Sequence, residues 1–287
     1  MSKEFSNNIE SPASPERFGR NVNINAIFLR HGEKVIDLGM SHTGLTEAGL
    51  RMSSDFGARL EEKDAIKPYS SDTARTIDTV MAAVNASPTE KKLSLRITDE
   101  LRSDYDEKGP FLSSAFVMKK EILGQDFKEL PAEEQKRRLR AYYAKLQDRY
   151  LSYRDQRPDA STQSPLELAA NLAKRVDIYI RMADRLKSGS RVDLLNATHD
   201  WDVLSFMNEM MLRQIDGREV RGFQSVEEIG GPIGYTENFN VDIATDGEGR
   251  KTVGLEFRGQ KYPFDQKRLQ ELVETAERLD AERAMGS

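Results

Sequence analysis

The chain has 287 residues, of which 38% are hydrophobic and 32% are charged, a composition typical of a soluble globular protein. Its net charge of −5 favours neither nucleic acid nor an acidic membrane surface as a partner. The lack of cysteine excludes disulfides, thiolate metal sites and a cysteine nucleophile, and no apolar run is long enough to span a bilayer. We therefore expect a cytoplasmic protein.

The first 20 residues are polar and lack the apolar core of a secretory signal, so we predict a flexible N-terminal tail over residues 1–20. Residues 21–287 have a length that suits one large domain carrying an inserted cap. We find no internal repeat and no low-complexity segment.

The first part of this domain alternates between strand-like and helix-like segments. We expect strands over residues 26–29, 65–69 and 93–97, separated by helices over about 46–61 and 72–84. Thr46 is a suitable N-cap for the first helix, and Arg75 falls in the first turn of the second. This order predicts an α/β fold, a three-layer αβα sandwich with a mostly parallel central sheet.

The middle of the chain differs from this pattern. Residues 102–160 are rich in charged and aromatic side chains and begin as a predicted loop. A helical spacing follows at Leu139, Tyr142, Tyr143, Leu146 and Tyr150. We predict a mainly helical cap inserted over the working edge of the sheet.

Regular elements return after the cap. Ser164, Pro165 and Glu167 have the types and spacing of an N-cap, N1 and N3 at the start of a helix. We then expect a buried strand, a helix, a long loop, two strands and a closing helix, at residues 192–197, 203–212, 217–236, 238–244, 252–257 and about 269–279.

Reactive side chains follow the buried strands. Arg30 and His31 come directly after the strand at 26–29, and His199 and Asp200 follow the strand at 192–197. The carboxyl ends of parallel strands meet at one edge of a sheet, where ligands bind. Arginine forks fit phosphate oxygens, and a histidine between them can attack phosphorus. Together with Arg75, these residues predict a phosphoryl-transfer site.

Three motifs carry a resemblance to a known family. They are Arg30-His31-Gly32, then Ser70, Ser71, Arg75 and Thr76 at a helix start, and His199 after a late strand. In this order the chain resembles the histidine phosphatase superfamily, or phosphoglycerate mutase-like fold, from about residue 24 to residue 200. The resemblance implies a phosphatase that hydrolyses small phosphomonoesters through a phosphohistidine on His31, without a cofactor. It also implies that Arg30, Lys34, Arg75 and His199 bind the phosphate, while Gly32 lets the backbone approach the ligand.

The proton donor is left open between several acids. Asp200 fits the acid phosphatase branch of the family, in which an Asp directly follows the second histidine. Glu100 fits the mutase branch, in which a Glu lies downstream of the second arginine. Asp104 and Glu237 are further candidates. Lys34 stands where the first branch usually has Arg, and Ile36 stands where that branch has Pro.

Other interpretations of the three histidines are weaker. A metal site is disfavoured because arginines accompany His31 and His199, and His42 has no motif partner and suits a loop.

Two alternative functions remain, a phosphomutase of the same fold and a non-catalytic regulatory protein that binds phosphorylated ligands. The substrate is not specified, because the cap that would select it carries the weakest resemblance.

Overall fold

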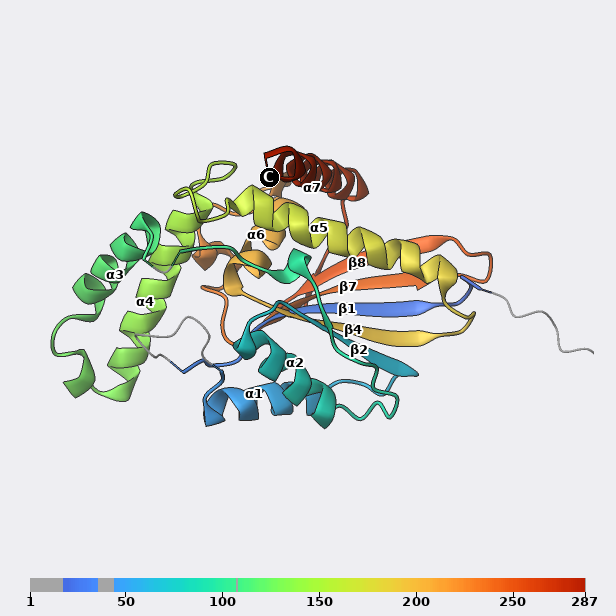
Figure 1. Cartoon of the computed structure of the whole chain (residues 1–287), viewed down its shortest axis with the longest axis horizontal. Helices are drawn as coiled ribbons and strands as arrows, with labels where there is room; N and C mark the ends of the chain where they lie inside the picture. Colours follow the sequence, from blue (N-terminus) through green and yellow to red (C-terminus); the bar gives the residue numbers. More distant parts are fainter. Residues whose placement is uncertain (1–17, 36–43, 107, 287) are drawn as a thin grey trace, which may run out of the picture.

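The structure is a computed structural model that describes residues 18–35, 44–106 and 108–286. Most of the predicted tail and His42 lie outside the described residues. A seven-stranded sheet crosses the molecule in the order β3-β2-β4-β1-β7-β8-β9 (Figure 1). In chain order these strands are β1 Asn23–Arg30, β2 Ala65–Ser70, β3 Arg96–Ile97, β4 Arg191–Thr198, β7 Asn238–Thr245, β8 Lys251–Phe257 and β9 Gln260–Tyr262.

The first four strands of the sheet are parallel. β1 pairs with β4, β4 with β2 and β2 with β3, whereas β7 runs antiparallel to β1 and β8 and β9 continue as antiparallel neighbours. In the central pair Arg30 lies opposite Thr198. His31 and His199, the residues that follow, therefore leave the sheet side by side. The predicted α/β class and mostly parallel sheet are confirmed.

Helices cover both faces of the sheet (Figure 1). One face carries α1 (Glu47–Ala58) and α2 (Ala74–Ala86), and the other carries α5 (Pro165–Met182), α6 (Asp200–Met210) and α7 (Gln266–Gly286). Strand β1 is buried between the two layers, because Ile27 and Leu29 pack into the cluster with α2 while Ala26 and Phe28 pack into the cluster with α5. Burial on both faces explains why its sequence is a continuous apolar run.

The cap is a pair of helices at one end of the molecule, α3 (Pro110–Leu123) and α4 (Ala132–Leu151) (Figure 1). The prediction of a loop before the Leu139–Tyr150 helix was wrong, because α3 occupies much of that segment. Pro110 begins α3 after Gly109, and the backbone of Gly124 ends it at φ +78°. The apolar faces of the two helices meet at Phe111, Ala115, Met118, Tyr142, Leu146 and Tyr150.

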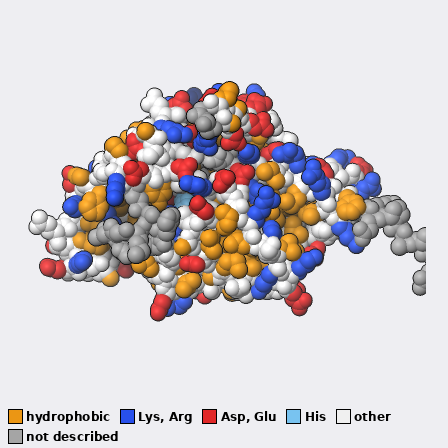
Figure 2. All heavy atoms as spheres, viewed as in Figure 1, with side chains coloured by type: hydrophobic (Ala, Val, Ile, Leu, Met, Phe, Trp, Pro, Cys, Tyr) orange, Lys and Arg blue, Asp and Glu red, His pale blue; other side chains and the backbone are white. Residues whose placement is uncertain are grey.

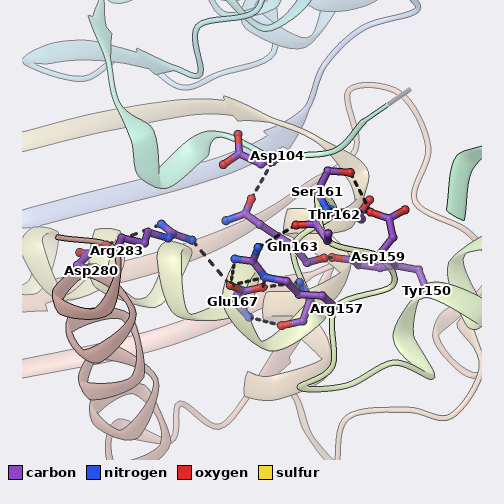
Figure 3. Close-up of polar contacts among 12 residues, drawn as sticks. Asp104, Tyr150, Arg157, Asp159, Ser161, Thr162, Gln163, Glu167, Asp280 and Arg283 are labelled. Atoms are coloured by element: carbon purple, nitrogen blue, oxygen red, sulfur yellow. Dashed lines mark hydrogen bonds and ion pairs between the residues drawn. The ribbon is translucent and has the colours of Figure 1, made fainter. Parts of the chain in front are cut away.

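The cap is fastened where it leaves and rejoins the main body (Figure 3). The Gln163 side-chain oxygen accepts a hydrogen bond from the Asp104 N–H (2.7 Å), and the Tyr150 hydroxyl donates to the Gln163 carbonyl (2.8 Å). Nearby, Arg157 pairs with Glu167, which also completes the capping box of α5. These bonds fix the start of α5 and confirm its predicted N-terminus.

Several element boundaries differ from the prediction. Helix α6 begins at Asp200 rather than near residue 203, because His199 serves as its N-cap and two acidic residues suit the first turn. The region 217–236 includes strand β6 (Arg218–Arg221), which pairs with β5 (Leu212–Ile215) across Asp216-Gly217. The strand predicted over residues 93–97 is present only as the shorter strand β3. Short 3-10 turns lie at Asp99–Leu101, Phe127–Glu129, Ala183–Arg185 and Val226–Ile229.

Among the helices of the described ranges, none combines the length and apolar character needed to cross a membrane.

Candidate active site

His31 is buried at the end of β1, with its ring orientation fixed by the backbone. Its Nδ1 lies 2.7 Å from the Gly32 carbonyl oxygen, an acceptor, so Nδ1 carries the proton and Nε2 keeps its lone pair. Burial lowers the pKa of His31 well below its usual range, and the nearby cations Arg30 and Arg75 lower it further. The imidazole is therefore neutral and nucleophilic at neutral pH.

Gly32 is also required for the packing of α1. A Cβ at this position would lie 2.7 Å from the Gly49 carbonyl oxygen and 2.8 Å from Ser53 Oγ, both in α1. The Gly32 N–H donates to the Thr79 hydroxyl of α2 (2.8 Å). The structure requires glycine here because α1 packs directly against the backbone that carries His31.

Arg30 is the last residue of β1, and its guanidinium is held on three sides. One nitrogen donates to the Ile233 carbonyl (2.6 Å), another lies 3.6 Å from Asp200 Oδ2, and the group stacks 4.3 Å above the Tyr235 ring. Its Nε is buried and has no hydrogen-bond partner within the described residues. A buried cation with an unsatisfied donor favours an anionic ligand nearby.

Arg75 lies in the first turn of α2 and joins two other parts of the site. It donates to the Tyr105 hydroxyl (2.9 Å) and to Nδ1 of His199 (3.3 Å). Its Nε is also buried without a partner in the described part of the chain. Two guanidinium groups from separate elements thus converge beside the two histidines, as the sequence predicted.

His199 is buried at the N-terminus of α6. Because Nδ1 accepts from Arg75, the proton of this ring is on Nε2, which lies 3.4 Å from Ser71 Oγ. Asp202 accepts from the His199 backbone N–H (3.3 Å) and holds the turn. The centres of the His31 and His199 rings are 5.5 Å apart. Burial and Arg75 lower the pKa of His199 well below its usual range.

Of the four candidate proton donors, only Asp200 lines the cavity beside His31. Its Oδ2 accepts from Gln147 Nε2 of the cap (3.1 Å) and faces Arg30. Glu100 instead accepts from the Thr98 hydroxyl, Asp104 pairs with Arg102, and Glu237 pairs with Arg258.

A cavity of about 600 Å³ opens above these groups, between the sheet edge and the cap. His31, His199, Arg30, Arg75 and Lys34 lie at one end. In the view of Figure 2, a small area of histidine atoms is visible at the surface among basic, acidic and hydrophobic side chains. Within the described ranges, no group of three or more His, Asp and Glu side chains is placed to hold a metal ion.

Residues 26–105 match the family model of the histidine phosphatase superfamily (branch 1). This superfamily consists largely of phosphatases and mutases. The matched segment contains Arg30, His31 and Arg75, and the fold adds His199 and Asp200 from outside it.

The solved structures that resemble this chain are distant from it in sequence. Phosphoglycerate mutase from Bacillus anthracis is 14% identical, with 88% of this chain and 98% of that chain covered and a TM-score of 0.47. A mycobacterial glucosyl-3-phosphoglycerate phosphatase is 15% identical, with 80% and 97% covered and a TM-score of 0.44. Phosphoserine phosphatase from Entamoeba histolytica is 13% identical, with 86% and 99% covered and a TM-score of 0.41. No curated protein matches the chain.

Three residues of the site were missed by sequence reasoning. Tyr105 and Tyr235 contact the two arginines, and Gln147 binds the Asp200 carboxylate. They stand in loops and in the cap, outside any motif. No local signal in the sequence distinguishes them from other Tyr and Gln residues, because the contacts that define them join segments far apart in the chain.

Proposed function

We propose that this protein is a phosphomonoesterase that transfers a phosphoryl group from a small substrate to His31 and then to water. The observation that carries the proposal is the state of His31. It is neutral, its Nδ1 is pinned by the Gly32 carbonyl, and two buried guanidinium groups lie beside it. Such a histidine is prepared for nucleophilic attack on an anionic phosphate.

In the first step, the lone pair of His31 Nε2 forms the nitrogen–phosphorus bond as the bond between phosphorus and the leaving oxygen breaks. The leaving oxygen takes a proton from the Asp200 carboxylic acid. Arg30, Arg75, Lys34 and the Nε2–H of His199 stabilise the charge on the phosphoryl oxygens.

In the second step, the Asp200 carboxylate takes a proton from water, whose oxygen attacks phosphorus. The nitrogen–phosphorus bond breaks, inorganic phosphate leaves, and neutral His31 is regenerated. Asp200 thus returns to its acid form, so neither step needs a further reactant.

The test of the nucleophile is His31→Ala with p-nitrophenyl phosphate. We expect kcat/KM to fall by about 10³-fold or more, since the covalent route is lost. Acid-labile phosphate should be trapped on the wild-type chain and not on the variant. Turnover at the wild-type rate by His31→Ala would refute the mechanism.

The proton donor is tested by comparing Asp200→Asn with Glu100→Gln. Asp200→Asn should lower kcat/KM for alkyl phosphates by about 10²-fold or more and kcat/KM for p-nitrophenyl phosphate less, because this constant reports phosphoryl transfer to His31 and nitrophenolate leaves without a proton. Glu100→Gln should stay within about twofold of the wild type. The reverse ranking would assign the donor to Glu100, which is the expectation for a mutase.

The same experiments address the two alternative functions. A phosphomutase would require a bisphosphate primer and would return phosphate to a second substrate oxygen rather than to water. A non-catalytic phospholigand-binding protein would bind inorganic phosphate without releasing any from p-nitrophenyl phosphate. Release of phosphate into water without a primer separates our proposal from both.

A further inference from the structure

The cavity is far larger than a phosphate group, and several of its lining side chains are apolar. Its volume of about 600 Å³ falls in the range of about 300–1,000 Å³ that is usual for sites holding organic ligands. The histidines and arginines occupy only one end. The cap helices supply most of the other walls, through Leu112, Ala115, Phe116, Tyr142, Tyr143 and Leu146.

Aromatic side chains pack against one another next to the phosphate end. The Trp201 ring stacks on Tyr150 with 4.6 Å between ring centres, and Phe111 and Tyr105 pack edge-on against Trp201. The hydroxyl of Tyr105 in turn accepts from Arg75. A ligand whose phosphate is bound by Arg75 therefore places the group attached to that phosphate near aromatic rings.

Phe116 is only partly covered by the cap, with Lys120 Nζ 4.7 Å from the centre of its ring. It lines the cavity from α3, yet 49% of its surface is exposed. Among the described residues, Phe18 is the other exposed phenylalanine, and it lies outside this cavity. Exposed apolar surface is unfavourable in water, and a ring bound against Phe116 would cover it.

Cations stand at the outer part of the same cavity. Lys108 and Lys119 both line it, and Lys119 lies 5.8 Å from the centre of the Tyr142 ring. Positive charge at an entrance attracts anionic ligands and raises their rate of association. The cavity thus combines a cationic approach, an aromatic chamber and a phosphoryl-transfer end.

We propose that the substrate is an aromatic phosphomonoester, whose phosphoryl group lies at His31 and whose planar leaving group packs against Phe116, Tyr143 and Leu146. This inference rests on the proposed function for the phosphate end of the site. Leu112, Phe116 and Leu146 offer no hydrogen-bond partner to the hydroxyl groups of a polyol phosphate placed against them.

The test measures binding to phosphonates, whose carbon–phosphorus bond is not hydrolysed by this chemistry. By calorimetry, benzylphosphonate should bind at least about tenfold more tightly than methylphosphonate, a difference of about 1.4 kcal/mol. Phe116→Ala should reduce this preference about two- to tenfold, as expected for the loss of an aromatic pair. Val117→Ala is the matched control, because Val117 is the next residue of α3, is 55% exposed and does not line the cavity. It should leave the preference unchanged.

Equal affinities for the two phosphonates would overturn the inference, and so would equal losses in Phe116→Ala and Val117→Ala. Neither readout depends on turnover. A preserved preference for benzylphosphonate in a chain that releases no phosphate would refute the proposed function while supporting the aromatic site. Hydrolysis through His31 with faster turnover of glycerol phosphate than of phenyl phosphate would refute the aromatic substrate and keep the phosphatase.

Discussion

The sheet edge and the cap build the two halves of the same cavity in different ways. At the sheet edge, paired strands and a helix N-terminus fix the backbone of each reactive residue, and Arg30, His31 and His199 follow from their register. In the cap, α3 and α4 present aromatic side chains that hold one another through apolar packing. The sheet edge thus carries the charged groups of the proposed phosphoryl transfer, whereas the cap supplies apolar walls for the proposed aromatic leaving group.

One side chain joins the two regions. Gln147 of α4 is fully buried, donates through Nε2 to Asp200 Oδ2 and accepts through Oε1 from the Ile233 N–H (3.0 Å). The Ile233 carbonyl in turn accepts from Arg30. The cap therefore also orients the proposed proton donor. It contributes to the proposed reaction as well as to the walls that would contact the leaving group.

Among the tests that distinguish the sheet edge from the cap, the largest loss of kcat/KM is expected for Arg75→Ala. Removing a guanidinium that binds the transferring phosphoryl group should lower kcat/KM by about 10²- to 10³-fold. The loss should be the same for phenyl phosphate and glycerol phosphate, because Arg75 belongs to the sheet edge. Arg51→Ala, an exposed arginine of α1, is the control and should have no effect. A loss confined to aromatic substrates would contradict the assignment of Arg75 to the phosphate end of the cavity.

A smaller effect is expected for Gln147→Leu, because it removes the amide that orients Asp200 and leaves the Ile233 N–H unpaired. We expect kcat/KM for alkyl phosphates to fall about tenfold, or by about 1.4 kcal/mol in the barrier. The kcat/KM for p-nitrophenyl phosphate should change little, because this constant reports phosphoryl transfer to His31 and the nitrophenolate leaves without a proton. Equal losses on the two substrates would indicate that Gln147 serves the fold alone.

The pH profile tests the state of the nucleophile. Since the pKa of His31 in the folded chain lies well below 6.5, the neutral form persists as the pH falls through 6.5. An imidazole of ordinary pKa would be about 90% protonated at pH 5.5, and its rate would fall about tenfold. We expect the rate of His31 phosphorylation to be less than twofold lower at pH 5.5 than at neutral pH, as measured by rapid quench with p-nitrophenyl phosphate. A tenfold fall centred near pH 6.5 would contradict the assigned neutral state.

The smallest effect is expected for Ser164→Ala, at the joint where the cap rejoins the main body. The Ser164 hydroxyl accepts from the Glu167 N–H (3.2 Å) in the capping box of α5. Its loss should lower the free energy of unfolding by about 1 kcal/mol, measured by urea denaturation. Kinetic constants at 25 °C should stay within about twofold of the wild type, since Ser164 touches neither half of the cavity. A larger kinetic loss would show that the joint controls the site.

Most of the sheet and several helix starts could be predicted, because their signals are local. Each signal lies within a few residues, and each predicted element is present in the structure. Examples are the apolar run at 26–29, the helix N-cap Thr46 and the helix start Ser164-Pro165-x-Glu167. The cap could be predicted only in part. Helix α3 was missed because its apolar side chains reach their partners on α4 and α6 only after folding.

Short motifs at strand ends were enough to predict the parallel sheet, the set of reactive side chains and the resemblance to the histidine phosphatase superfamily, whose model matches residues 26–105. Tertiary structure decided the rest. It placed Asp200 rather than Glu100 in the cavity, showed that α1 is what requires Gly32, and brought Gln147, Tyr105 and Tyr235 to the site. These outcomes depend on distances between segments far apart in the chain, and those distances are set by packing rather than by local sequence.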